Sequence, residues 1–555
     1  MKRSNVLSIL GLFVFSLLLR TIPFFDFVYW GTDCGEYFYY TQRWIGTGQA
    51  YTAIDGWGNA YPFFPGMYTF SGGLHLTTTI PLQITTVLFP AVLSSLTIIF
   101  IFVLVHSITK KVKGSLVSAF FLSILAPFVY NYSQPKPETV GFFLMVLLLI
   151  MVIRFKPYNK KILYLMIPTS FALVITHHLT SYFFALFLFG GIFTSMIVRR
   201  KTRETDKLRL YFFVFFISLT LFYWMIFAPP FREDRLLNAL GTPSYSILAA
   251  PFVFIALTLL LKKLRDRSDF RLSIQFEKEN ARSILLLSLP PVAIGVALLL
   301  YSSFFNVPGT AITLGASALL YIPLISFAVF IVPSRVPIRI YRDGLQVWGW
   351  LLFTLLSFAA GVITGSSSLL PMRQVVFMML PVSILLGIGI TESFKLLNPI
   401  SDRKKTIAIL SILILLFAWN LPFIYPSQEM MDGYQEGSDT ADIETGYWLK
   451  GTDKKVATDH RLSATVFALS NKNLTWTEGS DIYFSTDPDQ AYTEAEDMNI
   501  TYIMWDSVME EGVMTTAQET APPVDDELIN EYGRSNFLVY DNGDNVIFFL
   551  KKHPS

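Results

Sequence analysis

Two carboxylates, Asp33 and Glu36, stand three residues apart in an aromatic stretch between the first two long apolar runs of the chain. This spacing places both side chains on one side of a helical turn. A carboxylate held beside a substrate can remove or deliver a proton, so the pair is a candidate general acid–base centre. A carboxylate here can also face water or cap a short helix. The pattern favours a catalytic part for Asp33 and leaves Glu36 undecided.

The stretch that carries this pair, residues 26–79, is longer than an ordinary connection between membrane helices. Arg43, ten residues after Asp33, could bind a phosphate or pair with Glu36. Tyr61 belongs to a run of aromatic residues that could line a substrate site. Cys34, the only cysteine, has no local partner and is interpreted as a small filler, although it could be a nucleophile. The aromatic residues include Tyr37, Tyr39, Tyr40, Trp44, Trp57, Tyr61 and Phe64.

A second candidate group, Lys136 and Glu138, lies in the segment SQPKPETVGFF. Two prolines fix the backbone there, so the loop would aim both side chains. The alternative is a helix start with Glu138 in the first turn, where a carboxylate is favoured by the helix dipole. The pattern slightly favours a binding site.

Three further candidates stand at the ends of later apolar runs: His177, His178 and Arg373. The adjacent histidines could contact a phosphate, bind a metal or form a polar turn, and the sequence leaves these open. Adjacent residues of a regular helix point about 100° apart, which disfavours joint ligation of one metal. Arg373 could hold a phosphate with two parallel hydrogen bonds. It could also be an anchor that extends to the membrane surface.

The elements that must position these residues are membrane helices. The chain has 555 residues, of which 53% are hydrophobic and 15% charged, with a mean hydropathy of +0.49. This composition excludes a soluble globular protein. Thirteen apolar runs have about the length that spans a bilayer. They cover 6–25, 80–106, 114–131, 139–155, 162–178, 180–198, 208–229, 246–261, 283–305, 313–333, 345–364, 374–392 and 406–425.

Charge predicts the orientation of these helices. The net charge of +2 combines a basic part, residues 1–425, with an acidic part, residues 426–555. Most basic residues of the first part fall on one side when the chain is threaded with its N-terminus in the cytoplasm, as the positive-inside rule requires. We therefore predict an uncleaved first helix, a cytoplasmic N-terminus and an extracellular C-terminal part in the plasma membrane. Loop 26–79 then lies on the outer face.

Residues 426–555 predict a soluble exterior α/β domain after the membrane domain of residues 1–425. Helical patterns at 440–450, 463–470 and 488–498 alternate with short β-rich runs. The acidic charge and the lack of a basic surface with interleaved aromatic residues disfavour nucleic-acid binding.

The membrane part resembles the GT-C superfamily of membrane glycosyltransferases. The resemblance rests on GTDCGEYFYYTQRWIGTG, the following YPFFPGMYTF, the QPKPET loop and LPMRQVVFMMLP. It implies a polytopic α-helical fold with about 13 transmembrane helices and a C-terminal exterior domain. DIETGYWLKG and KVATDHRLSATVFAL resemble the exterior domain of archaeal members.

The resemblance also implies a chemistry. The donor would be a hexose such as mannose on a polyprenyl or dolichyl phosphate in the membrane, and transfer would invert the anomeric carbon. Asp33 would be the general base on an acceptor hydroxyl, with Glu36 assisting it or binding sugar hydroxyls. Arg43, Lys136, Arg373, His177 and His178 would supply positive charge for the phosphate. Tyr61 and Glu138 are the remaining residues predicted to bind the substrate or its phosphate.

Several points stay open at this stage. The acceptor could be a lipid-linked glycan or a protein hydroxyl, and membrane lipids surround the protein. The chain lacks the WWD motif of oligosaccharyltransferases, which disfavours transfer of a whole glycan to asparagine. No cofactor is specified, although a divalent metal such as Mg²⁺ or Mn²⁺ would suit related enzymes. A lipid-linked glycan flippase or transporter is the rival class, but no internal repeat supports it.

Overall fold

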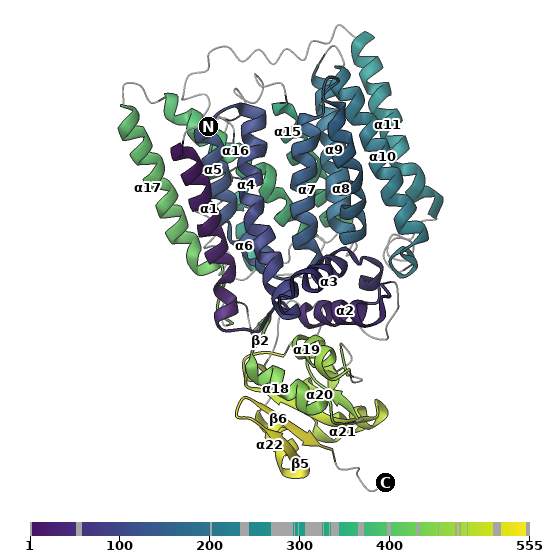
Figure 1. The fold of residues 1–555 in the computed structure, drawn as a ribbon. Coiled ribbons are helices and arrows are strands. Elements are labelled where there is room, and N and C mark those ends of the chain that lie inside the picture. Colours follow the sequence, from purple (N-terminus) through teal and green to yellow (C-terminus); the bar gives the residue numbers. More distant parts are fainter. Residues whose placement is uncertain are drawn as a thin grey trace. The chain divides into compact units, whose positions relative to one another are not determined.

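The computed structural model describes residues 3–50, 58–199, 203–233, 244–267, 343–364, 371–396 and 401–550, with short gaps within the last range, and a few residues between 292 and 334 (Figure 1). The chain forms two compact units. The helical unit comprises Met1–Leu17, Leu93–Asn131 and Val140–Ile424. The mixed unit comprises Leu18–Val92, Tyr132–Thr139 and Tyr425–Ser555.

The helical unit is built from long apolar helices. Their side chains are apolar on most faces, as expected for helices that contact both lipid and one another. Helix α9 packs against α8, α10, α11 and α15, while α16 packs against α5, α15 and α17 (Figure 1). The helices are α1 (Arg3–Thr21), α4 (Phe89–Thr109), α5 (Val112–Ile124), α6 (Ala126–Ser133), α7 (Pro137–Arg154), α8 (Leu163–Thr176), α9 (His178–Val198), α10 (Glu204–Ile226), α11 (Ser244–Arg267), α15 (Gly344–Thr364), α16 (Pro371–Leu396) and α17 (Asp402–Asn420).

Within the described residues, 8 helices are long and apolar enough to cross a membrane, or up to 9 if one bent pair counts as a span. The chain is therefore a multi-pass helical protein, and the count of thirteen spans stays a prediction. The predicted run 313–333 falls mostly outside the described residues, and the run 283–305 falls about half outside them. The spans are Arg3–Phe25, Ile84–Thr109, Pro137–Arg154, His178–Val198, Glu204–Ile226, Gly344–Ile363, Arg373–Ser393 and Arg403–Phe423.

Two predicted spans differ from straight membrane helices. The run 114–131 forms α5 and α6, which are bent by 64° at Leu125. Leu125 has an extended backbone with ψ 115°, and Pro127 follows it in the first turn of α6, where proline is tolerated. The run 162–178 forms α8, whose 14 residues are fewer than a bilayer span requires.

The mixed unit joins the first predicted outer loop to the C-terminal part of the chain. The loop folds into η1 (Ile22–Phe25), β1 (Tyr29–Trp30), α2 (Cys34–Thr47), η2 (Tyr61–Phe63), α3 (Gly66–Thr78) and η3 (Ile84–Leu88). Strand β1 pairs antiparallel with β2 (Gly437–Ser438), so that Tyr29 lies opposite Ser438 and Trp30 opposite Gly437. This pairing fixes the residues that directly precede Asp33.

A four-stranded sheet forms the rest of the mixed unit, in the order β3-β4-β6-β5. Strand β3 runs parallel to β4, and the other two pairs are antiparallel. The strands are β3 (Lys455–Ala457), β4 (Ile500–Asp506), β5 (Phe537–Asp541) and β6 (Asn545–Phe549). The helices are α18 (Thr440–Leu449), α19 (His460–Ser470), α20 (Ser480–Phe484), α21 (Pro488–Asp497) and α22 (Asp526–Ser535).

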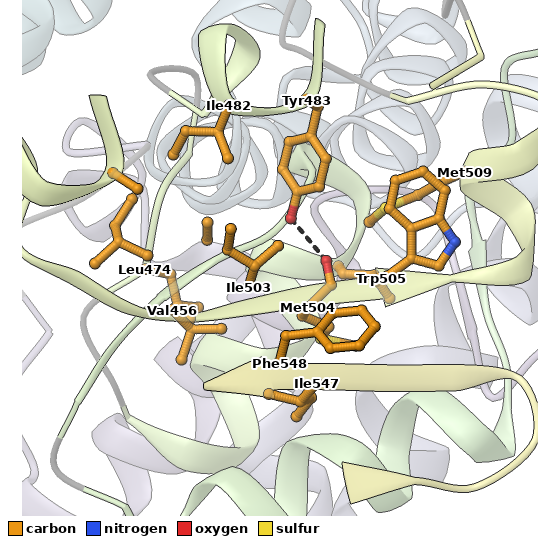
Figure 2. Close-up of a cluster of buried hydrophobic side chains, with 14 of the residues drawn as sticks. Val456, Leu474, Ile482, Tyr483, Ile503, Met504, Trp505, Met509, Ile547 and Phe548 are labelled. Carbon is orange, nitrogen blue, oxygen red and sulfur yellow. Dashed lines mark hydrogen bonds between the residues drawn. The ribbon is translucent and has the colours of Figure 1, made fainter. Parts of the chain in front are cut away.

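An apolar core holds this sheet to its helices. Figure 2 shows the central side chains, among them Ile503 and Ile547 of neighbouring strands. The hydroxyl of Tyr483 donates to the carbonyl oxygen of Met504 at 2.7 Å, so this buried polar group is satisfied inside the core (Figure 2). Such burial is the main stabilising contribution in a unit of this size.

The predicted helices at 440–450, 463–470 and 488–498 overlap α18, α19 and α21, whereas α20 and α22 were not predicted. The predicted boundary at residue 425 also coincides with the start of the last segment of the mixed unit. The mixed unit, however, includes loop residues 18–92 and 132–139. Division into domains of 1–425 and 426–555 therefore stays a prediction.

Candidate active site

Helix α2 presents Asp33 at its first end. Asp33 occupies the N-cap position, yet its side chain accepts no capping hydrogen bond from the helix. The other end of α2 is closed by Gly48, whose positive φ of 66° lets its N–H donate to the carbonyl oxygen of Trp44. The Asp33 carboxylate therefore does not cap its helix, which was the alternative to a catalytic role.

The Asp33 carboxylate is held by tyrosine hydroxyls. Its Oδ2 atom accepts hydrogen bonds from Tyr37 at 3.2 Å and from Tyr61 at 3.3 Å. The rings of Tyr37 and Tyr61 pack edge to face, with centroids 5.3 Å apart. The Asp33 side chain remains 27% exposed. This arrangement orients the carboxylate and leaves it open to a substrate.

His460, the first residue of α19, lies on the other side of Asp33. Its Nε2 atom is 3.9 Å from Asp33 Oδ1, and the imidazole is 8% exposed. Burial lowers the pKa of His460, although the charges of Asp33 and Asp459 and a hydrogen bond with the Trp476 backbone oppose that shift. A neutral imidazole leaves the negative charge of Asp33 uncompensated, which suits a base.

Glu36 has the opposite environment from Asp33. It is 0% exposed, and its Oε1 atom accepts a 2.6 Å hydrogen bond from the Tyr40 hydroxyl. Burial and the charge of Asp33 raise the pKa of Glu36 well above its usual range, against the effect of the Tyr40 hydrogen bond. Two nearby carboxylates with different environments are a recurring acid–base arrangement. Here the exposed Asp33 is suited to accept a proton, while Glu36 favours its protonated form.

Glu36→Gln is expected to change the pH dependence of stability. Folding raises the pKa of Glu36. The protonated Glu36 side chain therefore contributes fully to the stability of the fold below the pKa that Glu36 has in the unfolded chain. This contribution is lost as the pH rises through the pKa that Glu36 has in the folded protein. Glutamine keeps an acceptor for Tyr40 and does not ionise. We expect the melting temperature of the variant to match or fall below wild type at pH 4 and to exceed it increasingly at alkaline pH. Equal melting profiles from pH 4 to 9 would contradict this assignment.

Close packing of α2 on α19 brings these groups together. A Cβ atom on Gly35 would lie 2.4 Å from the carbonyl oxygen of Ala464, so only glycine permits this approach. The contact explains how His460 reaches Asp33.

Gly35→Ala is expected to destabilise the mixed unit by about 1–3 kcal/mol, because backbone atoms of α19 must move. Thermal unfolding of the purified protein measures the loss. Gly46→Ala is the matched control, since an added Cβ there has nothing within 4 Å. Similar effects of the two substitutions would show that α2 and α19 do not depend on this contact.

A second set of polar groups surrounds Lys136. Its Nζ atom donates to Gln134 Oε1 at 2.9 Å, and Gln134 donates through Nε2 to Glu436. Glu436 also accepts a 3.1 Å hydrogen bond from the Tyr434 hydroxyl. Lys136 is therefore held through Gln134 by the segment before β2. Glu138 is buried in the first turn of α7, as its structural alternative predicted.

Arg43 lies on α2 beside a small hollow. It is half-buried, and it lines the hollow together with Tyr40, Trp44 and Tyr68. The described residues form no salt bridge with Arg43, so its predicted pairing with Glu36 is not observed. Trp57, one of the aromatic residues of the loop, lies outside the described residues.

The other three predicted ligands belong to the helical unit. His177 ends α8 and caps α9, since its side chain accepts a hydrogen bond from the Thr180 N–H. The ring of His178 packs on Phe231, with centroids 4.5 Å apart. Arg373 donates through Nη1 to Asn131 Oδ1 at 2.8 Å. These contacts give His177, His178 and Arg373 structural roles. Phosphate binding by these residues stays a prediction.

Several residues of the site were not singled out from the sequence. Tyr37 and Tyr40 were noted only as members of an aromatic run, and His460 and Glu436 were not singled out at all. Spacing of four residues links Tyr37 to Asp33 and Tyr40 to Glu36, which is a signal the sequence does contain. Cys34 lies in a small apolar cluster with Tyr29, Phe38 and Val87, and burial raises the pKa of its thiol, in agreement with a filler.

A divalent metal requires several oxygen or nitrogen ligands around one point. No group of three His, Cys, Asp or Glu side chains suited to a metal occurs in the part of the chain that the structure describes. Glu36 already binds Tyr40 and favours its protonated form. The described residues therefore do not fit a metal site, and metal dependence stays a matter for experiment.

The fold is similar to those of several glycosyltransferases of known structure. The apo crystal structure of the Archaeoglobus fulgidus oligosaccharyltransferase aligns with a TM-score of 0.60 at 14% identity, over 92% of this chain and 70% of that chain. The same enzyme, AglB, in complex with an inhibitory peptide and a dolichol-phosphate gives 0.59 at 13% identity over the same shares. The arabinofuranosyltransferase AftD from Mycobacteria gives 0.50 at 10% identity, over 100% of this chain and 40% of that chain.

At these identities the comparison establishes the fold alone, and it confirms the GT-C resemblance predicted from the sequence. No protein-family model matches the chain. No curated protein matches it either.

Proposed function

We propose that the protein is an integral-membrane glycosyltransferase that moves a sugar from a polyprenyl-phosphate donor to an acceptor, with inversion at the anomeric carbon. One observation carries the proposal. In a chain with a GT-C fold, the Asp33 carboxylate is oriented by Tyr37 and Tyr61, remains partly exposed and does not cap its helix. A placed base of this kind typically contributes about 10²–10⁴-fold in rate.

The reaction follows from this placement. Asp33 accepts the proton of an acceptor hydroxyl while the hydroxyl oxygen forms a bond to the anomeric carbon. The bond between that carbon and the phosphate oxygen breaks, and polyprenyl phosphate leaves with the bonding electrons. Tyr37 and Tyr61 hold the carboxylate in line, and protonated Glu36 avoids a second negative charge beside it.

The leaving phosphate needs fixed positive charge, which an enzyme supplies best when it is held in advance. Lys136 is suited to this because Gln134 and Glu436 restrain it. Arg43, Arg373, His177 and His178 are further proposed contributors. Glu138, buried at the start of α7, is a further proposed ligand.

The similarity to AglB supports a second candidate, transfer of a whole glycan to asparagine. A crystal structure of that enzyme holds a tethered acceptor peptide containing the NVT sequon, and another structure shows it in complex with an inhibitory peptide and a dolichol-phosphate. This chain lacks the WWD motif. We therefore favour transfer of a single hexose such as mannose to a lipid-linked glycan or a protein hydroxyl at the outer face of the plasma membrane.

Release of polyprenyl phosphate by the purified protein tests the proposal. Polyprenyl-phosphate mannose, polyprenyl-phosphate glucose or a lipid-linked oligosaccharide is supplied with a membrane lipid extract, an NVT peptide or a serine-rich peptide. Acceptor-dependent release with a labelled product supports transfer and identifies the acceptor class. Release only from a lipid-linked oligosaccharide with the NVT peptide supports the second candidate. Translocation of lipid-linked glycan in vesicles without any release would instead favour a flippase.

A further inference from the structure

Three asparagines of the chain stand in the pattern Asn-x-Ser or Asn-x-Thr, in which x is not proline. In a part of a protein outside the cell, this pattern marks an asparagine whose side-chain amide can accept a glycan at the surface. The three are Asn131, Asn473 and Asn499. The structure distinguishes Asn131 from Asn499, while Asn473 lies outside the described residues.

Asn131 is not accessible to a glycan. It belongs to α6, is 8% exposed, and accepts a 2.8 Å hydrogen bond from Arg373 at its Oδ1 atom. A glycan on its amide nitrogen would displace the side chains that surround it and would break this bond. We therefore expect Asn131 to stay unmodified.

Asn499 has the opposite environment. It is exposed in the turn that joins α21 to β4, and its side chain forms no hydrogen bond with the described residues. Its φ of 55° lies in the left-handed region, which asparagine tolerates better than most residues. Its backbone N–H donates to the carbonyl oxygen of Glu496 at 2.9 Å. The turn is thus fixed by its backbone, and the amide side chain is not used to hold it.

The residues after Asn499 present the pattern at the surface. Ile500, the middle residue, is 6% exposed and belongs to the apolar core of the sheet. Thr501, which supplies the hydroxyl that the pattern requires, is half-buried at the start of β4. The residue that the pattern leaves unspecified therefore anchors the turn, and the two that it specifies keep contact with solvent.

The turn lies at the end of the sheet away from the candidate base. Strands β3 and β4 run parallel, and Asn499 immediately precedes β4. His460, which approaches Asp33, follows the opposite end of β3. At about 3.3 Å per residue, the strands separate these two ends by on the order of 10 Å. A glycan on Asn499 therefore starts away from the contact between α19 and α2.

We infer that Asn499 is an N-glycosylation site, at which this protein is itself the acceptor of a glycan from a lipid-linked oligosaccharide. The Nδ2 atom of Asn499 forms a bond to the anomeric carbon of the first sugar, and the amide loses one proton. The bond between that carbon and the phosphate oxygen of the lipid breaks, and the phosphorylated lipid leaves with the bonding electrons. The inference rests on the predicted exterior location of the mixed unit and is independent of the proposed function.

Mass spectrometry of the full chain, purified from the membranes of its source cells, tests the inference. Cleavage after acidic residues releases the peptide Met498–Asp506, in which Asn499 is the only asparagine. We expect this peptide to carry a glycan and the peptide that contains Asn131 to be unmodified. An unmodified Met498–Asp506 peptide would overturn the inference.

Three variants assign the modification to the pattern. Asn499→Asp keeps the shape of the side chain and tolerates the left-handed backbone, but it lacks the amide nitrogen. Thr501→Val removes the hydroxyl and keeps a β-branched side chain that suits a strand. Both should lose the glycan, whereas Thr501→Ser should keep it. The melting temperature of each variant shows whether the fold is retained, and a glycan that persists in Asn499→Asp or Thr501→Val would contradict modification at this pattern.

Translation into microsomal vesicles separates the location of the site from its recognition in the source cells. Asn473→Gln removes the neighbouring pattern, and the same chain with Asn499→Asp is the control. A glycan on the first chain only supports the inference. A glycan absent from both the vesicles and the source cells would overturn the inference and the predicted orientation, whereas a glycan found only in the vesicles would overturn the inference alone. Sugar transfer by Asp33 is measured separately, so failure of either proposal leaves the other to its own test.

Discussion

Asp33→Asn is expected to lower the rate of sugar transfer about 10²–10⁴-fold, the contribution of a placed general base. Asparagine has nearly the same shape and still accepts hydrogen bonds from Tyr37 and Tyr61, so the site should keep its geometry. It cannot take a proton at neutral pH. The loss should therefore lie in kcat, with KM for the lipid donor little changed, and is measured as release of polyprenyl phosphate.

Two controls separate this effect from a general loss of the loop. Asp26→Asn changes an exposed carboxylate of the same loop and should leave the rate within about twofold. The pH–rate profile of wild type should show an acidic limb, and Asp33→Asn should remove that limb. If Asp33→Asn and Asp26→Asn transfer sugar equally well, Asp33 is not the base, and Glu138 or Glu36 would need to be tested in its place.

The sequence was most informative where local pattern decides the structure. Asp33 and Glu36 were predicted on one helical turn, and α2 begins directly after Asp33. The long apolar runs coincide with most of the described membrane helices, because length and hydrophobicity alone determine a span. The β-rich runs around residues 455 and 503 likewise coincide with β3 and β4, most of whose residues are buried.

What the sequence could not predict depends on contacts between distant segments. Gly35 gives no sign of touching Ala464, more than 400 positions later, and so His460 could not be assigned to the neighbourhood of Asp33. Glu436 holds Lys136 only through Gln134. The different environments of Asp33 and Glu36 are also a property of burial, which a spacing of three residues does not reveal.

Arg461→Leu is expected to destabilise the mixed unit by about 3–5 kcal/mol, the cost of leaving a buried charge without its partner. Arg461 is 1% exposed, and its guanidinium donates to Asp442 at 3.0 Å and to Asp506. It also donates to the carbonyl oxygen of Gly437 at 2.8 Å, in the strand that pairs with β1. Leucine would leave two buried carboxylates without a cation and would loosen the pairing that precedes Asp33. The loss of stability is measured by urea denaturation of the purified protein, with unfolding followed as the protease sensitivity of residues 425–550.

The same physics predicts a rescue that distinguishes charge from shape. Replacing the whole buried triad by neutral groups of similar size often costs little, because the desolvation of three ions is removed together with their attraction. Arg461→Met combined with Asp442→Asn and Asp506→Asn should therefore recover much of the stability that Arg461→Leu loses. Asparagine at 442 can still accept the Asp439 N–H in the capping box of α18, and asparagine at 506 can still cap the 3-10 helix η12 (Ser507–Glu510) through its side-chain oxygen. Arg534→Leu, at an exposed arginine of α22, is the control and should change stability by less than about 0.5 kcal/mol.

If Arg461→Leu is as mild as this control, the triad is dispensable. If the triple variant is no more stable than Arg461→Leu, the loss comes from the shape of the arginine side chain and its bond to Gly437, and not from the buried charges.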